Sequence, residues 1–387
     1  MHHSAKLGAF AAGVLFAAQP LGARVPDAPA LPSREDAPIA YLVDATSGQV
    51  LFAREPDRRF MPASITKVMT TFLAFEWMEE GRIRGEQILQ VRPETWARWH
   101  NVGSTMFLPA NARVSVDTLL HGITTVSAND GAAVLAQGVG GSMAAWTAAM
   151  NAKARDIGMA DSHFATANGW MDEGQTFVTA RDLVTLGRQM VLRHPAKYRH
   201  FVGQKRFRYN NIEQVNHDPI TGVVPGADGI KTGFTNQAGY GFLGSAERGG
   251  RRLMMVVAGS PRGAQRNKAA RGLIEWGFAA FDSRALIRAG ATVASAEVQD
   301  GSVSNLSLRA PRAIVISVPR GTRPEVAMRV RYQGPLKAPI AEGTEVAELV
   351  ITVAGQPSFA VPLVADSDVM QATALQRVFN GFAAWLP

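Results

Sequence analysis

Residues 62–67 read Pro-Ala-Ser-Ile-Thr-Lys, and an apolar stretch with helical periodicity follows them. Pro62 favours the start of a helix, so Ser64 and Lys67 are expected in its first turn. Side chains three residues apart lie on the same face of a helix, so the Lys67 amine can reach the Ser64 hydroxyl. A serine hydroxyl becomes nucleophilic when a base removes its proton, and a lysine of lowered pKa is such a base. The stretch therefore predicts a serine nucleophile, although S-x-x-K alone is a weak signal.

Two further short motifs strengthen this prediction. Residues 127–129 read Ser-Ala-Asn (S-x-N), and residues 231–233 read Lys-Thr-Gly (K-T-G), just before a predicted strand. Taken singly, the first is an ordinary turn and the second an ordinary strand entry. All three motifs occur once and in the order that penicillin-binding proteins and class A β-lactamases require. Their joint occurrence by chance is improbable.

On these residues the chain resembles a low-molecular-mass penicillin-binding protein, specifically a serine-type D-alanyl-D-alanine carboxypeptidase. The resemblance covers nearly the whole chain and includes the segments 103–108, 179–182, 228–234 and 276–281. It implies removal of the last D-alanine from the pentapeptide stem of peptidoglycan, through an acyl-enzyme that water hydrolyses. It also implies β-lactams as covalent inhibitors, and no cofactor or metal.

The resemblance implies a role for each catalytic residue. Ser64 is the expected nucleophile, Lys67 its general base, and Ser127 the group that relays a proton to the departing D-alanine. Asn129 is expected to hold the substrate amide. The backbone N–H groups of Ser64 and Phe234 are expected to form the oxyanion hole, which stabilises the charge of the tetrahedral intermediate.

The resemblance also implies a site for the substrate's terminal carboxylate. Lys231 and Thr232 are expected to bind it, and Lys231 to keep Lys67 neutral. Gly233 has no side chain in the way of the substrate backbone. Arg262 is a candidate second contact to the carboxylate.

The chain departs from its relatives at two points. Phe234 follows K-T-G where some relatives carry histidine, which bears on substrate preference and pH dependence. No E-x-x-L-N segment occurs, so rapid β-lactam hydrolysis is excluded.

Two alternatives stay open: a D,D-endopeptidase of the same serine class, and a catalytically silent peptidoglycan-binding envelope protein. The extra β-rich region favours the carboxypeptidase, and the complete trio argues against the silent protein.

Periodicity and turn signals predict the remaining elements. We expect a hairpin, an apolar helix ending before Gly81, a mostly helical region with a T-x-x-D cap, a second hairpin and one more helix. Their ranges are 39–43 with 49–53, 65–78, 116–190 with the cap at 179–182, 239–246 with 252–259, and 266–281. Short β-rich runs follow at 315–318, 326–332, 346–353 and 359–364. The predicted fold is an α/β (α+β) penicillin-binding/β-lactamase-like transpeptidase domain followed by a small all-β sandwich domain.

The two ends predict export and membrane attachment. Residues 1–23 have the charged and apolar regions of a signal peptide, and a proline-rich linker follows over 24–37. We place the catalytic domain at 38–281, the β-rich domain at 282–365 and an amphipathic anchor helix at 366–387. The apolar stripe of that helix either lies in the membrane interface or completes a protein core. The expected location is the periplasm, peripherally attached to the outer face of the inner membrane.

Composition limits the possible partners. The chain has 387 residues, 47% of them hydrophobic, no cysteine, and a formal net charge of +8. The charge indicates either an anionic partner or simply a basic surface. Scattered Lys and Arg residues, no nucleic-acid-binding motif and predicted export exclude nucleic acid as the partner. The eight histidines are dispersed, and no cluster with metal-ligand spacing appears.

Overall fold

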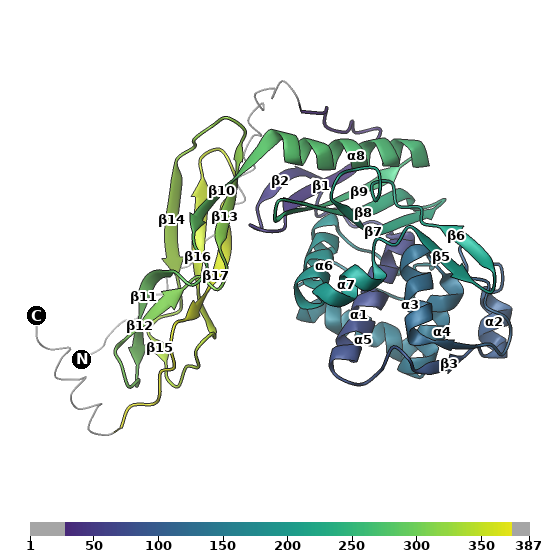
Figure 1. Ribbon diagram of the computed structural model, residues 1–387, viewed down its shortest axis with the longest axis horizontal. Coiled ribbons are helices and arrows are strands. Elements are labelled where there is room, and N and C mark those ends of the chain that lie inside the picture. Colours follow the sequence, from purple (N-terminus) through teal and green to yellow (C-terminus); the bar gives the residue numbers. More distant parts are fainter. Residues whose placement is uncertain (1–27, 374–387) are drawn as a thin grey trace, which may run out of the picture.

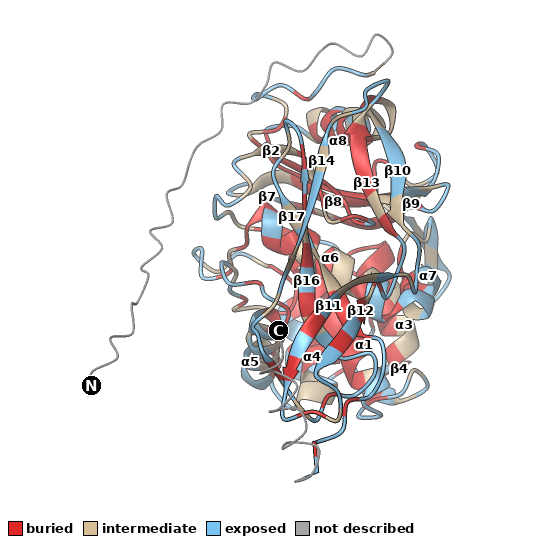
Figure 2. Ribbon diagram, turned by 90° about the vertical axis from the view of Figure 1, so that its left-hand side faces the viewer, coloured by how far each residue is buried: buried red, intermediate tan, exposed pale blue. Residues whose placement is uncertain are grey.

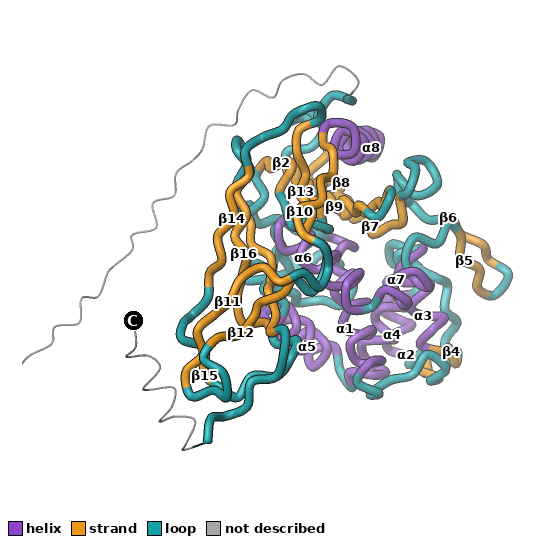
Figure 3. The backbone as a smooth tube through the Cα atoms, turned by 60° about the vertical axis from the view of Figure 1, so that its left-hand side comes forward, coloured by secondary structure: helices purple, strands orange, loops and turns teal. Residues whose placement is uncertain are grey.

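The computed structural model describes residues 28–373, which fold into two bodies lying side by side (Figure 1). The first body combines helices with a sheet. The second body begins at residue 281 and consists of strands, which stand apart from the helices in Figure 3. The predicted order of an α/β domain followed by an all-β domain is confirmed. The predicted signal peptide lies outside the described residues.

A five-stranded antiparallel sheet forms one layer of the first body. Its strand order is β2-β1-β9-β8-β7, with β1 Ile39–Asp44, β2 Val50–Arg54, β7 Ala227–Thr235, β8 Gly239–Arg248 and β9 Arg251–Ser260. Both predicted hairpins are confirmed, since β1 pairs with β2 and β8 pairs with β9. Strand β7 carries the K-T-G motif at the edge of this sheet, where a strand keeps unpaired backbone groups.

The sheet is buried on both faces. Along β1, Ile39, Tyr41 and Val43 pack into the core shared with the helices, whereas Ala40 and Leu42 pack into the core beneath α8 (Gly263–Ala280). Successive side chains of a strand point to opposite faces, which explains this alternation. The buried residues of both layers are red in Figure 2. The sheet is therefore a rigid support for the edge strand β7.

The helical layer packs against the face of the sheet opposite α8. It contains η1 Ala63–Thr66, α1 Lys67–Glu79, α2 Pro93–Trp99, α3 Val116–Thr125, α4 Asn129–Gly140, α5 Met143–Asp156, α6 Ala180–Arg193 and α7 Pro195–Phe201. Two short two-stranded antiparallel sheets flank it: β3 Ile88–Gln90 with β4 Arg113–Ser115, and β5 Arg206–Tyr209 with β6 Ile212–Val215. Helix α1 is buried at every residue from Lys67 to Trp77, as expected of a helix with no polar face.

The region 116–190 is mostly helical, as predicted, with a break at residues 157–179 that the helical periodicity did not predict. No helix forms there, and Gly158, Gly169 and Gly174 adopt positive φ angles that interrupt regular structure. The predicted cap at the end of this segment is confirmed. The hydroxyl of Thr179 accepts a hydrogen bond from the backbone N–H of Asp182, which begins α6.

The second body has its own hydrophobic core. Its sheets are β14-β16-β17-β12-β11-β15 and β10-β13, with β10 Phe281–Ile287, β11 Thr292–Gln299, β12 Asn305–Arg309, β13 Ile314–Pro319, β14 Val326–Arg331, β15 Leu336–Lys337, β16 Glu345–Val353 and β17 Phe359–Ala365. The four predicted β-rich runs correspond to β13, β14, β16 and β17. Strands β10, β11, β12 and β15 were not predicted, because they are rich in polar and small residues that carry a weak strand signal.

A buried polar joint connects the two bodies. The carboxylate of Asp44 accepts hydrogen bonds from Arg251 Nε at 2.8 Å and from Ser317 Oγ at 2.6 Å. Arg251 also donates to Ser317 Oγ at 2.7 Å. The Gln49 side chain accepts from Ser317 N and donates to Ser317 O. These four buried residues satisfy one another across the junction, as buried polar groups must.

The segment after β17 differs from its prediction. Residues 366–373 are extended, Val369 forms a bridge with Ile340, and Gln371 forms one with Gly301. Val369 is fully buried in the core of the second body, which holds this segment in place. The helix predicted over 366–387 therefore does not include residues 366–373, and the rest of it lies outside the described residues. Among the described helices, none has the length and apolar character needed to cross a membrane.

Candidate active site

Ser64 lies in the short helix η1, at the entrance to the buried helix α1. Lys67 follows one turn later, and its Nζ lies 2.9 Å from Ser64 Oγ. The same nitrogen lies 2.7 Å from Asn129 Oδ1 and 2.7 Å from the backbone oxygen of Asn168. The S-x-x-K pair thus has the contact that its spacing predicts.

The surroundings of Lys67 favour its neutral form. Lys67 is fully buried, and burial lowers its pKa well below the ordinary value. The ammonium of Lys231 lowers the pKa further, and the Asp130 carboxylate opposes this. A neutral amine has two N–H bonds and one lone pair. Asn129 Oδ1 and Asn168 O accept the two N–H bonds, so the lone pair faces the Ser64 hydroxyl, which is the arrangement of a general base.

Ser127 and Asn129 lie between α3 and the first turn of α4. Ser127 has a positive φ of 63° and is 5% exposed. The amide of Asn129 is engaged at both ends: Oδ1 contacts Lys67, and Nδ2 donates to the backbone oxygen of Val102 at 3.0 Å. Asn129 was expected to hold the substrate amide, which stays a prediction, and in this structure its side chain contacts Lys67.

Strand β7 places the K-T-G motif beside η1. A Cβ on Gly233 would overlap the backbone oxygen of Pro62 and crowd Ile65, so only glycine lets the strand approach the nucleophile turn this closely. Phe234 is 47% exposed at the strand edge, and its ring stacks on Tyr240 with centroids 4.0 Å apart. Gly233 therefore has a packing role in addition to the one predicted.

Lys231 is the second buried lysine of the site. It is 5% exposed, and its Nζ donates to the backbone oxygen of Thr232 at 3.2 Å. Burial, reinforced by the charge of Arg266, lowers the pKa of Lys231 to about 7. Near neutral pH this lysine therefore needs a counter-charge to stay protonated, and a ligand carboxylate provides one.

Comparison with known proteins identifies the family. The family described as D-alanyl-D-alanine carboxypeptidase matches residues 27–262, and the penicillin-binding protein 5 C-terminal domain matches residues 281–371. The chain belongs to the D-alanyl-D-alanine carboxypeptidase family. The family, the fold class and the serine-type carboxypeptidase activity predicted from the sequence are confirmed.

Individual relatives match nearly the whole chain. The D-alanyl-D-alanine carboxypeptidase DacA of Haemophilus influenzae is 30% identical over 358 residues, covering 92% of this chain and 90% of the relative. The crystal structure of penicillin binding protein 5 from Haemophilus influenzae superposes with a TM-score of 0.75 at 30% identity and covers 88% of this chain and 100% of that one. Penicillin-binding protein D2 of Listeria monocytogenes in its ampicillin-bound form is 28% identical, with a TM-score of 0.56 over 63% of this chain and 97% of that one.

The carboxypeptidase site contains an arginine that sequence reasoning missed. Arg262, the predicted carboxylate contact, is exposed before the first turn of α8. Arg266 lies one turn further, is 7% exposed, and donates from its NH1 to the backbone oxygen of Gly241 at 3.1 Å. Its charge acts on both Lys231 and His217. The i, i+4 spacing of the two arginines was the available signal, but it does not say which of them is buried.

Asn168 was also missed, because it contributes a backbone oxygen rather than a side chain. Its neighbour Gly169 has a φ of +72°, and a Cβ there would overlap the backbone oxygen of Ala63. Glycine at this position lets the segment approach the nucleophile turn. The sequence carries no motif for such a contact.

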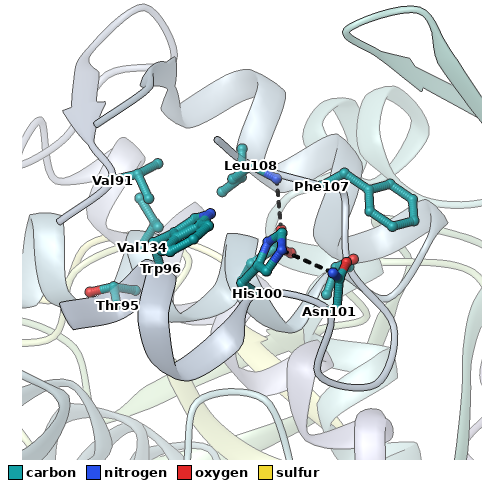
Figure 4. A pocket seen from close by; sticks show the side chains of 10 residues that line it. Val91, Thr95, Trp96, His100, Asn101, Phe107, Leu108 and Val134 are labelled. Carbon is teal, nitrogen blue, oxygen red and sulfur yellow. Dashed lines mark hydrogen bonds between the residues drawn. The ribbon is translucent and has the colours of Figure 1, made fainter. Parts of the chain in front are cut away.

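Asp130 fixes the segment 100–108, which borders the site. Its carboxylate accepts the backbone N–H groups of Met106 at 3.0 Å and Leu108 at 3.1 Å. Burial raises the pKa of Asp130, and these hydrogen bonds oppose the rise. A small pocket lies beneath the segment (Figure 4), lined in part by Val91, Trp96, Leu108 and Val134. Asp130 therefore ties the segment to the start of α4, next to Asn129.

Proposed function

We propose that Ser64 is the nucleophile, and Lys67 its general base, in the removal of the terminal D-alanine from peptidoglycan pentapeptide stems. The observation that carries this proposal is the environment of the Lys67 amine, which is buried, deprived of a carboxylate partner and within 2.9 Å of Ser64 Oγ. An amine held neutral in this way can accept the serine proton at neutral pH.

In the acylation step, Lys67 takes the proton of Ser64, and Ser64 Oγ bonds to the carbonyl carbon of the penultimate D-alanine. The negative charge on the carbonyl oxygen is stabilised by the backbone N–H groups of Ser64 and Phe234. The bond to the terminal D-alanine then breaks, and Ser127 relays a proton to the departing amine. Water next attacks the ester and gives a proton to Lys67; the bond to Ser64 Oγ then breaks, Lys67 returns the proton to Ser64, and the shortened peptide leaves.

Lys231, Thr232 and Arg266 are proposed to bind the carboxylate of the terminal D-alanine. Burial and the nearby charge of Arg266 lower the pKa of Lys231, and a carboxylate between the two side chains relieves their repulsion. We propose Arg266 in place of Arg262, because Arg266 is buried next to Lys231 and Arg262 is exposed. Recognition of a free carboxylate favours the carboxypeptidase over the endopeptidase.

Labelling with a fluorescent penicillin tests the assignment of Ser64. The purified protein is expected to gain one penicillin per chain, located at Ser64 by peptide mass mapping, and to release D-alanine from a pentapeptide. Ser64→Ala should abolish both. Ser162→Ala is the matched control, because this serine lies near α6 and contacts Asp182 rather than the site. Labelling that persists in Ser64→Ala would contradict the assignment, and an unlabelled parent protein would favour the silent alternative.

We also propose that the enzyme works in the periplasm, held at the outer face of the inner membrane by residues after Thr373. The amphipathic periodicity of residues 375–386 and the net charge of +8 support binding to an anionic lipid surface.

The domain limits proposed from the sequence, 38–281 and 282–365, also remain proposals. The second limit needs extension to Thr373, because Val369 is buried in the β core.

Two truncations test the attachment. A chain ending after Thr373 should stay folded and active but no longer sediment with anionic vesicles at low salt. A chain ending after Asp366 should also lose stability in the second body, because Val369 leaves its core. If the full chain does not bind vesicles, or if the chain ending after Thr373 unfolds, the terminal residues complete a protein core instead.

A further inference from the structure

Three potential metal ligands meet on the surface of the first body, on helices α3 and α7. His121 and Asp117 lie one turn apart on α3, and His200 lies on α7. The His200 Nε2 atom is 3.2 Å from Asp117 Oδ1, and the His121 Nε2 atom is 3.8 Å from Asp117 Oδ2. All three ligand atoms lie within 4.8 Å of one another. The dispersed histidines of the sequence did not predict this grouping.

These separations fit a single bound cation. With metal–ligand bonds of about 2.0 to 2.1 Å, two ligands of a tetrahedral metal lie roughly 3.3 Å apart. The two distances to the Asp117 carboxylate lie on either side of that value. Small rotations of the side chains would bring all three ligand atoms to the separation that a metal requires. Both imidazoles present the same nitrogen, Nε2, to the carboxylate. A cation placed between the three groups would replace the ion pairs seen in the structure.

The cluster is partly pre-organised. The ring of Phe201 lies against both imidazoles, with centroids 4.8 Å from His121 and 4.5 Å from His200. Phe201 is 2% exposed and thus restricts the rotation of both rings. The side chains of His200 and Asp117 are 58% and 44% exposed, so water can complete the coordination of a metal.

We propose that Asp117, His121 and His200 form a binding site for one late first-row divalent cation, such as Zn²⁺, Co²⁺ or Ni²⁺. Two imidazoles and one carboxylate are ligands for these metals, whereas Mg²⁺ and Ca²⁺ prefer oxygen alone. The site is structural, since it contains none of the residues assigned to the peptidase reaction. It would join α7 to α3, the helix that leads into Ser127.

A contact between the two helices shows what the metal would reinforce. Thr124 Oγ1, near the end of α3, donates to the backbone oxygen of Phe201 at 2.7 Å. Ser127 follows Thr124 by less than one helical turn. A cation that binds only the folded chain stabilises it by mass action, so the melting temperature should rise with metal concentration.

Titration with Zn²⁺ after treatment with a chelator tests the site, followed by calorimetry and by thermal unfolding. We expect one cation per chain and a rise of about 5 °C in melting temperature at a hundredfold excess over Kd. Co²⁺ should give visible absorption bands of a nitrogen- and oxygen-ligated ion. No binding by the parent protein, or binding with no spectral change, would overturn the proposal.

Variants separate metal binding from the ion pair. His200→Lys places an amine beside Asp117 and removes an imidazole ligand, so Zn²⁺ affinity should fall at least tenfold while metal-free stability is kept. Asp117→Asn should weaken binding similarly. His163→Gln, an exposed histidine outside the cluster, is the control and should bind as the parent does. Unchanged Zn²⁺ affinity in His200→Lys would place the metal elsewhere and refute the site.

Discussion

Buried cationic side chains occur in two regions of this chain, the active site around Ser64 and the joint around Asp44. In the joint, Arg251 is paired with the Asp44 carboxylate and bonded to Ser317, so its charge is fully compensated. In the active site, Lys67 and Lys231 contact only neutral oxygens, and no ion pair forms to either among the described residues. The pKa values of both lysines are lowered as a result.

The difference shows what each region is built to do. A compensated buried ion pair is costly to break and fixes the geometry of a junction. An uncompensated buried amine is costly to keep charged, so it is available as a base or as a receptor for an anionic ligand. The chain therefore holds its two bodies together with compensated charges and uses uncompensated ones in its candidate active site.

The largest effect is expected where the base is made permanently charged. Lys67→Arg replaces the neutral amine with a permanent cation, because a guanidinium does not give up its proton at neutral pH. The acylation rate should fall by roughly 10³-fold. Stopped-flow penicillin labelling measures it, and Lys153→Arg, which changes a lysine paired with Glu76 far along α5, is the control. An acylation rate within about tenfold of the parent would mean that Lys67 is not the base.

Removing a charge from the joint should affect stability rather than chemistry. Asp44→Asn leaves Arg251 buried without a counter-charge, which should lower the free energy of unfolding by about 3 to 5 kcal/mol. Asp57→Asn, which breaks the exposed pair with Arg181, should cost no more than about 1 kcal/mol. Urea unfolding compares the two variants. Equal losses would show that the joint is not the compensated region described here.

Substitutions of Arg262 and Arg266, at the start of α8, give an intermediate effect. Arg266→Ala should raise KM about 10- to 100-fold for a peptide ending in D-alanyl-D-alanine, with little change for the corresponding amide, which lacks the carboxylate. Arg262→Ala should leave both substrates unaffected. If the two variants behave in the opposite way, the contact first expected from the sequence is the correct one. Equal cleavage of acid and amide by the parent would favour the endopeptidase.

The pH profile gives the smallest and most specific effect. Binding of the substrate carboxylate needs protonated Lys231, whose pKa in the free enzyme is about 7. As pH rises through that value the lysine loses its charge, so kcat/KM should decline, by at most tenfold per pH unit. Lys231→Arg stays charged, so its profile should show no such decline below pH 9. A decline that persists in this variant would belong to another group.

Much of the fold and of the candidate site could be predicted because short-range patterns in the sequence specify it. Alternation along β1 and β9, the apolar length of α1 and the hydroxyl cap at Thr179 are all short-range signals, and each predicted its element. The prediction of a mostly helical region over 116–190 did not locate the break at 157–179, where glycines with positive φ interrupt a composition that otherwise favours helix. A helix cap can be predicted from a few neighbouring residues, whereas the course of an irregular loop depends on the tertiary contacts that pack against it.

The sequence by itself determined the order of the two domains, and it predicted the candidate nucleophile Ser64, a candidate base one helical turn away and the K-T-G strand. It could do so because each depends on residues within a few positions of one another. The tertiary structure alone decided which charges are compensated. Asn168 meets Lys67, Arg266 lies beside Lys231, and Asp44 meets Ser317, all across large sequence separations. Burial and Coulomb interactions depend on distance in space, so the pKa of a lysine and the strength of a joint are set only when the chain has folded.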